Sequence, residues 1–157
     1  MPFTVFSQKF NLSNNLNKLV LDQTTIQQAT QILGKPNQED KVFVSNEDKF
    51  DYALKYDSLK IVLRFDKHTK MLLQIWINPS SPVMLNEKIS PSKSDTASVM
   101  AVFGNPNNKI YNIEESFYYY PYNNLQTQLL SLFFEKGILT DIVIDSQKAM
   151  SKNAEIH

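Results

Sequence analysis

The chain has 157 residues, of which 42% are hydrophobic and 20% are charged, a composition typical of a soluble globular protein. Its 16 basic and 16 acidic residues balance, and Arg64 is the only arginine, so we expect no nucleic-acid partner held by phosphate contacts. Cysteine is absent, which excludes disulfides, thiol catalysis and thiolate metal sites for this chain.

The start of the sequence gives an expectation for the cellular compartment of the protein. Residues 1–6 lack a basic region followed by a long apolar run, which argues against an uncleaved signal peptide. No apolar stretch approaches the length of a membrane span. We therefore expect a cytoplasmic protein with no membrane partner; the alternative is a periplasmic protein whose leader has been removed.

The first predicted elements are two helices. Spaced leucines in residues 11–20 favour a short helix. A second helix is predicted up to Leu33, because residues 22–25 offer N-cap side chains and a stripe of apolar residues follows them. Gly34 ends this helix in a conformation that glycine tolerates, and Pro36 prevents its resumption.

Strands are predicted after this helix, because the apolar period changes from 3.6 to 2. The predicted strands are residues 42–44, 50–56, 58–66 and 71–78. Residues 79–90, rich in proline and serine, are predicted to form a linker. A further helix then begins within residues 91–95 and ends at Gly104 and Pro106. The last predicted strands are residues 110–113, 117–122, 126–135 and 138–145, followed by a polar tail.

The two halves of the sequence resemble each other. Gly34 and Gly104 are 70 residues apart, and so are Pro36 and Pro106. Residues 61–67 align with 130–136 at an offset of 69, and 71–78 with 138–145 at 67, so the length change falls in a turn. We expect an α+β fold of two tandem repeats, each a helix followed by a four-stranded antiparallel sheet, with the helices packed on one sheet face. The predicted domains are residues 1–78 and 91–145, with a linker at 79–90 and a C-terminal tail at 146–157.

Candidate catalytic groups are sparse. His68 lies in a predicted hairpin turn with no nucleophile fixed near it, and Glu114 and Glu115 form a charged turn. Three glycines cannot build a phosphate-binding loop, and no metal-ligand spacing occurs. We therefore expect a protein that is not an enzyme, with no catalytic residues, no metal and no cofactor.

Aromatic residues suggest a binding surface instead. Residues 117–122 carry aromatic side chains on both sides of one strand, whereas core packing uses one side. Either Phe117 and Tyr119 point inward and the alternate tyrosines outward, or the reverse. Tyrosine and tryptophan are frequent in binding hot spots. The predicted partner-binding residues are Arg64, Trp76, Tyr118, Tyr120, Tyr122 and Phe133; the alternative is an internal surface between the two repeats.

The chain also resembles the beta-lactamase inhibitory protein family and the small outer-membrane-assembly lipoproteins. The resemblance is carried by the segment Leu16-Asn17-Lys18-Leu19-Val20-Leu21 and by the helices 25–33 and 96–103, which end in Gly34 and Gly104. It implies a non-catalytic scaffold whose concave sheet face grips another protein. The chain departs from these families in lacking disulfide cysteines, the lipid-bearing cysteine and the leader.

These observations predict a protein-binding module, specifically an inhibitor or immunity protein that neutralises a bacterial toxin or enzyme through an aromatic sheet face. Two alternatives stay open. The chain could be an envelope-associated assembly or structural factor, or a small-ligand carrier.

Overall fold

A computed structural model describes residues 10–45, 49–111, 114–122 and 127–154. Its helices are the 3₁₀ turn η1 (Leu16–Lys18), α1 (Ile26–Leu33), α2 (Thr96–Phe103) and α3 (Gln147–Ala154). Its first strands are β1 (Gln38–Ser45), β2 (Lys49–Tyr56), β3 (Ile61–Phe65) and β4 (Leu72–Ile77). The later ones are β5 (Asn108–Tyr111), β6 (Glu115–Pro121), β7 (Leu129–Glu135) and β8 (Ile138–Asp145).

All eight strands form one antiparallel sheet in the order β1-β2-β3-β4-β8-β7-β6-β5. The central pair joins β4 to β8, with Gln74 opposite Asp145 and Ile77 opposite Ile142. The predicted fold of two helix-plus-four-strand repeats is therefore wrong. Pairing β4 with β8 satisfies the backbone groups of two strands that would otherwise be free edges, which favours one continuous sheet over two small ones.

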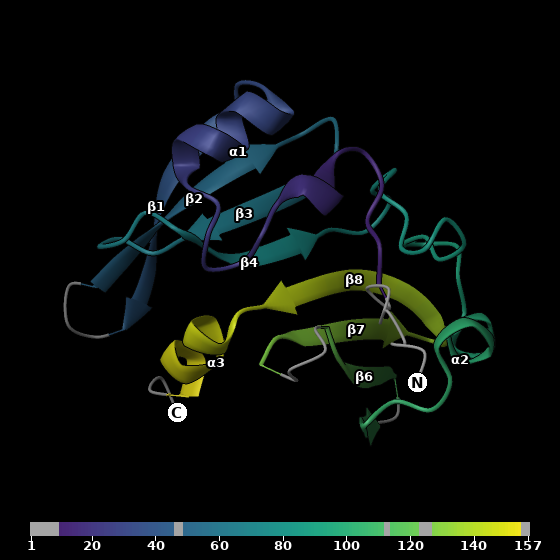
Figure 1. Ribbon diagram of the computed structural model, residues 1–157. Coiled ribbons are helices and arrows are strands. Elements are labelled where there is room, and N and C mark those ends of the chain that lie inside the picture. Colours follow the sequence, from purple (N-terminus) through teal and green to yellow (C-terminus); the bar gives the residue numbers. More distant parts are fainter. Residues whose placement is uncertain (1–9, 46–48, 112–113, 123–126, 155–157) are drawn as a thin grey trace, which may run out of the picture.

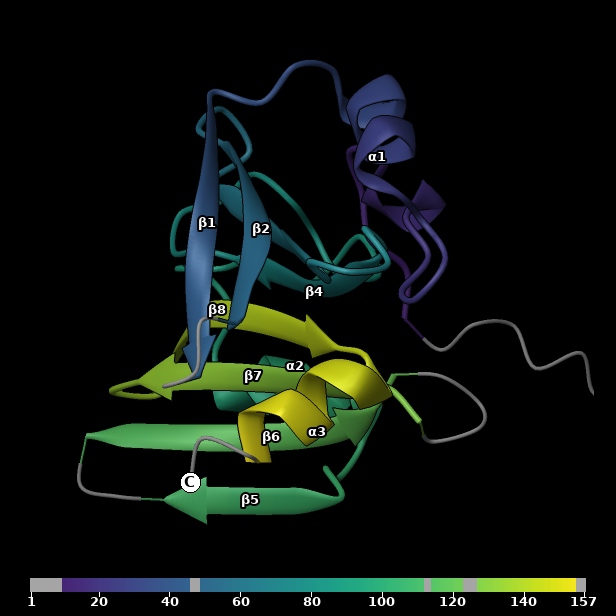
Figure 2. The same cartoon turned by 90° about the vertical axis from the view of Figure 1, so that its left-hand side faces the viewer.

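The sheet is strongly twisted, and its helices do not share one face. Strands β1 and β2 run almost vertically in Figure 2, whereas β5 to β8 run across it. Helices α2 and α3 lie on opposite sides of strands β6 to β8 (Figures 1 and 2). The prediction that the helices pack on one sheet face is therefore wrong for α3, which packs against β4 and β8 and lies in the segment expected to be a polar tail.

Helices α1 and α2 begin and end as the sequence predicts. Thr25 caps α1 in a capping box with Gln28, and the Asp95 side chain accepts a hydrogen bond from the Ser98 backbone N–H at the start of α2. Gly34 and Gly104 end these helices with φ angles of 88° and 78°, which favour glycine over residues with a side chain. The short helix predicted in residues 11–20 is a single 3₁₀ turn.

The C-terminal ends of α1 and α2 are each also held by a tyrosine from the sheet. The Tyr56 hydroxyl donates to the Gly34 carbonyl at 3.0 Å, and the Tyr120 hydroxyl donates to the Gly104 carbonyl at 2.9 Å. Both carbonyls belong to the last turn, where helices leave acceptors without an internal donor. These two bonds fix α1 and α2 over the same sheet face.

The core lies between that sheet face and the segments that cover it. Phe10 packs against Phe103 with ring centroids 4.8 Å apart and stacks on Tyr122 at 6.0 Å. The segment predicted as a linker also enters this core. Its buried side chains are Val83, Leu85 and Ile89.

Candidate protein-binding face

We call the sheet face opposite α1 and α2 the open face. Strand alternation assigns it residues that include Ala53, Lys55, Val62, Arg64, Gln74, Trp76, Phe117, Tyr119, Ser131, Phe133, Asp141, Val143 and Asp145. Of these, Ala53, Gln74, Ser131, Val143 and Asp145 are buried. An antiparallel sheet commonly packs one face on the core and leaves the other in solvent. Here α3 packs against the part of this face next to β4 and β8.

One row of neighbouring residues crosses the whole open face. It contains Gln38, Lys55, Val62, Trp76, Val143, Ser131, Tyr119 and Asn108, each opposite the next in strand register. Trp76 is close to the middle of this row, at the junction of β4 and β8. Cross-strand neighbours of this kind support one another. Within the row, Val143 and Ser131 are buried, each 4% exposed.

Trp76 is the large aromatic side chain that protrudes from this row. It is 41% exposed, and its indole Nε1–H donates to Asp141 Oδ1 at 3.1 Å. The bond satisfies the polar atom of the ring and restricts its orientation. A tryptophan held in place while still exposed loses little conformational freedom when a partner covers it.

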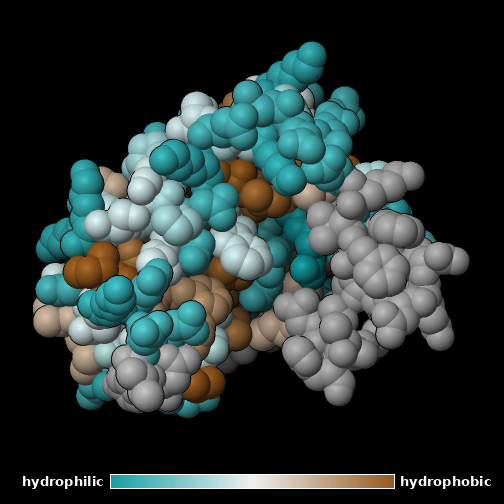
Figure 3. All heavy atoms as spheres, turned by 180° about the vertical axis from the view of Figure 1, so that it is seen from behind, coloured by the Kyte–Doolittle hydropathy of each residue, from teal (hydrophilic) through white to brown (hydrophobic). Residues whose placement is uncertain are grey.

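A smaller aromatic group lies two strands away. The Phe117 and Phe133 rings meet edge to face, with centroids 5.1 Å apart and an interplanar angle of 88°. Ile110, opposite Phe117 on edge strand β5, is 48% exposed. Seen from behind, on the side away from α1, hydrophobic side chains lie among hydrophilic ones over the middle and lower part of the molecule (Figure 3).

A charged group lies beside the tryptophan. Arg64 Nε is 3.3 Å from Asp51 Oδ2, and both side chains are largely buried. Gln74 Nε2 donates to Asp145 Oδ1 at 2.6 Å. Burial raises the pKa of the Asp145 carboxyl above its ordinary value, while the Gln74 hydrogen bond and the Arg64 charge act in the opposite direction. Arg64 is therefore committed to the carboxylates of the sheet, which limits it as a contact for a partner.

The structure separates the residues that the sequence assigned to one binding surface. Trp76, Arg64 and Phe133 lie on the open face. In contrast, Tyr118, Tyr120 and Tyr122 are 4%, 1% and 8% exposed and belong to the core under the helices. Of the two alternatives for residues 117–122, the one with the tyrosines inward is correct, so these three side chains do not form part of an exposed surface.

The aromatic ring on the open face next to Phe133 is instead Phe117, and Tyr119 lies beside Ser131 in the central row. Sequence reasoning named both as the alternative outward set but did not choose them. The pattern of residues 117–122 holds no signal that would have chosen them, because aromatic side chains alternate on both sides of the strand.

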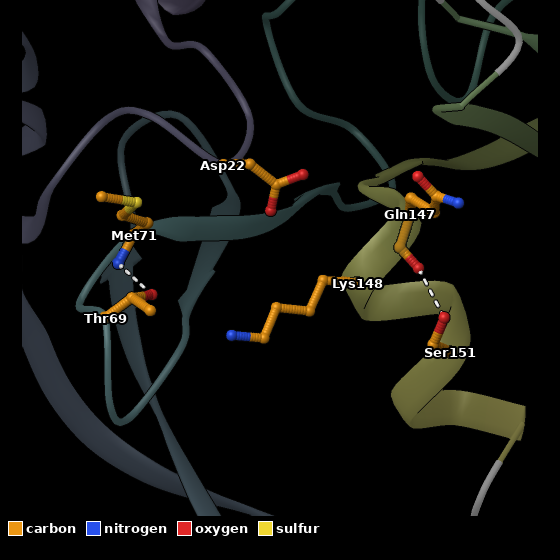
Figure 4. Close-up of a pocket in the computed structure, with 6 residues that line it drawn as sticks. All are labelled: Asp22, Thr69, Met71, Gln147, Lys148 and Ser151. Atoms are coloured by element: carbon orange, nitrogen blue, oxygen red, sulfur yellow. Dashed lines mark hydrogen bonds between the residues drawn. The ribbon is translucent and has the colours of Figure 1, made fainter.

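A hollow of about 450 Å³ lies between α3, the loop before α1 and the β3–β4 turn. Figure 4 shows Lys148 extending from α3 toward Thr69 and Met71 on the opposite side, with Asp22 above it. Lys148 Nζ is 2.9 Å from Asp66 Oδ2, and Asp66 also accepts the backbone N–H groups of His68 and Thr69. Burial raises the pKa of the Asp22 carboxyl. These charges hold α3 to the sheet.

Within the described parts of the chain, no three His, Cys, Asp or Glu residues gather so as to hold a metal ion. Among the same residues, none of the helices has both the length and the apolar character needed to cross a membrane.

Comparison with known proteins gives a likeness of fold. No family model matches the chain, and no curated protein matches it. A DUF4309 family protein (YjgB) from Bacillus subtilis superposes with a TM-score of 0.52 at 11% identity, covering 82% of each chain. A structure from Streptococcus mutans described as a "putative beta-lactamase inhibitor protein" gives a TM-score of 0.33 at 15% identity, covering 78% of this chain and 82% of that one. The first likeness shows a shared fold, and the second is too loose to show one.

Proposed function

We propose that this chain is a non-catalytic binding protein that holds another protein on its open face, and that it acts as an inhibitor or immunity protein against a toxin or enzyme. One observation carries the proposal. Trp76 stands 41% exposed at the junction of β4 and β8, with its indole held by Asp141.

The surroundings of Trp76 suit a binding interface. Binding hot spots are rich in tryptophan and lie near the centre of an interface, where neighbouring side chains exclude water. Val62 and Val143, on either side of Trp76 in the central row, supply apolar neighbours, and Lys55 supplies a polar margin. A specific interface buries roughly 800 Å² on each partner. An eight-stranded sheet offers such a surface on a rigid backbone.

The test uses a partner recovered from the native cell and then purified. Binding to this partner is measured for the unaltered chain and for Trp76→Ala. Loss of a hot-spot side chain costs about 2 kcal/mol or more, so we expect affinity to fall by roughly 30-fold. Val20→Ala is the matched control, because Val20 is 44% exposed and lies in the loop before α1. Its affinity should stay unchanged.

Both variants are first compared with the unaltered chain by urea unfolding, so that a loss of binding is not a loss of folding. Full binding by a folded Trp76→Ala variant would contradict the proposal. Equal loss in both variants would contradict it as well, because the effect would then not be specific to the open face.

A further inference from the structure

A small pocket opens on the open face, beside the start of β6, the end of β7 and the start of β8. Its volume is about 230 Å³. The residues that line it are Pro79, Glu115, Phe117, Phe133, Phe134, Glu135, Thr140 and Asp141. Pockets for drug-sized molecules measure roughly 300–1,000 Å³, so this one suits a single side chain better than an organic ligand.

The floor of the pocket is aromatic. Phe117 and Phe133 lie opposite each other on β6 and β7 and meet edge to face. Both rings remain partly exposed, so a ligand in the pocket can contact them. An exposed aromatic face carries negative charge density and attracts a cation placed over it.

The rim of the pocket is acidic. Glu115 lies directly opposite Glu135 in strand register, and Asp141 lies opposite Phe133 on the next strand. Acidic side chains from three neighbouring strands therefore border the pocket. None of the described residues that line the pocket is basic.

We propose that this pocket receives one basic side chain, an arginine, from the protein partner. The inference rests on the proposed function, since it names the chemistry that the open face recognises beside Trp76. A planar guanidinium can stack on phenylalanine while its N–H groups bond carboxylates in pairs. A lysine ammonium satisfies only the charge, so arginine is preferred.

Asp141 joins the pocket to the exposed tryptophan. Its Oδ1 accepts the Trp76 indole N–H at 3.1 Å, and the same residue lines the pocket. A carboxylate has acceptor sites for more than one donor. The Asp141 carboxylate can therefore accept hydrogen bonds from the Trp76 indole and from a bound guanidinium at the same time. A partner whose arginine fills the pocket would also lie close enough to cover Trp76.

The first experiment needs no partner. N-acetyl-arginine amide is titrated into the ¹⁵N-labelled chain, and N-acetyl-citrulline amide serves as the uncharged control of the same shape. We expect saturable shifts at residues of β6, β7 and β8 with arginine, with a dissociation constant on the order of millimolar for so small a probe. Citrulline should produce none. Equal shifts with both probes, or none with arginine, would overturn the inference.

Two variants sharpen this measurement. Glu135→Gln removes one rim charge at an exposed position and should weaken arginine binding by several-fold. Glu87→Gln removes an exposed carboxylate in the segment between β4 and α2, and should leave binding unchanged. An equal loss in both variants would show only attraction to overall negative charge and would also overturn the site.

A second experiment separates this inference from the proposed function. The purified partner is tested against Glu135→Lys and against Trp76→Ala. If both weaken binding, the pocket and the face act together. If only Trp76→Ala weakens it, the pocket inference fails while the proposed function stands. If neither does, the proposed function fails.

Discussion

The Tyr120 hydroxyl is a buried hydrogen-bond donor that fixes the end of α2. It donates to the Gly104 carbonyl at 2.9 Å, and burial raises its pKa to about 12, so it remains protonated and able to donate at neutral pH. The ring is also part of the aromatic core around Phe10 and Phe103. Tyr120 therefore connects the end of α2 to β6.

Tyr120→Phe removes this hydroxyl and leaves the ring in place. We expect the free energy of unfolding to fall by about 1 kcal/mol, because the Gly104 carbonyl loses its donor. Urea unfolding measures the change. Tyr119→Phe is the matched control, since Tyr119 is the adjacent residue on the other face of β6. A larger effect of Tyr119→Phe than of Tyr120→Phe would contradict this assignment.

The binding residues show what alternation along a strand can and cannot predict. Alternation placed Arg64 and Trp76 on the face away from α1 and α2, because only one face of β3 and β4 is uniformly apolar. It could not orient residues 117–122, since aromatic side chains occupy both sides of that strand. In the structure the inward set packs in the aromatic core, and Tyr120 donates a hydrogen bond to Gly104; an apolar pattern encodes neither contact.

At the scale of elements, α3 is held at its start by an ion pair. Lys148 Nζ reaches Asp66 Oδ2 at 2.9 Å; the Lys148 side chain is 46% exposed and that of Asp66 is 0% exposed. Ala149, next to it, is fully buried. The helix is only eight residues long, too short to be stable without such contacts.

Lys148→Ala should therefore loosen α3. We expect a loss of about 1 kcal/mol in the free energy of unfolding, a modest value because the lysine is half exposed and its charge is screened. Amide hydrogen exchange should become faster along α3. Gln147→Ala is the control, as an exposed residue of the same helix. Unchanged exchange in Lys148→Ala would show that the ion pair is not what holds the helix.

The sequence predicted α1 and α2 well and missed α3. Capping residues and terminal glycines mark the first two, and these signals are local. The segment that forms α3 is polar after Met150, and its helix is fixed by contacts with residues distant in sequence. Periodicity likewise indicated the eight strands, but it carries no information on which edge strands meet, so the single sheet could not be predicted.

At the scale of the whole molecule, the β4–β8 pair makes the two groups of four strands one structure. Ile75 and Ile144 face each other in this pair and are buried in the common core. The two groups therefore share both a ladder and a core. They should unfold together.

Trp76 offers a direct test, because it is the only tryptophan and lies in the β4–β8 pair. We expect urea unfolding followed by tryptophan fluorescence and by far-UV circular dichroism to give the same midpoint, the behaviour of a two-state transition. Two separate midpoints, with fluorescence changing first, would show that the groups of strands unfold independently.

The strand order has a consequence for how the chain reaches this structure. Every pairing in the sheet joins strands that follow one another in the sequence, except β4 with β8. Hairpins of sequence neighbours close quickly because little chain entropy is lost, whereas distant strands must find each other at greater entropic cost. Pairing of the two central strands, β4 and β8, is thus the slow step in folding. Trp76, which we place at the binding surface, lies in this pair, so the binding surface is completed only when that step has occurred.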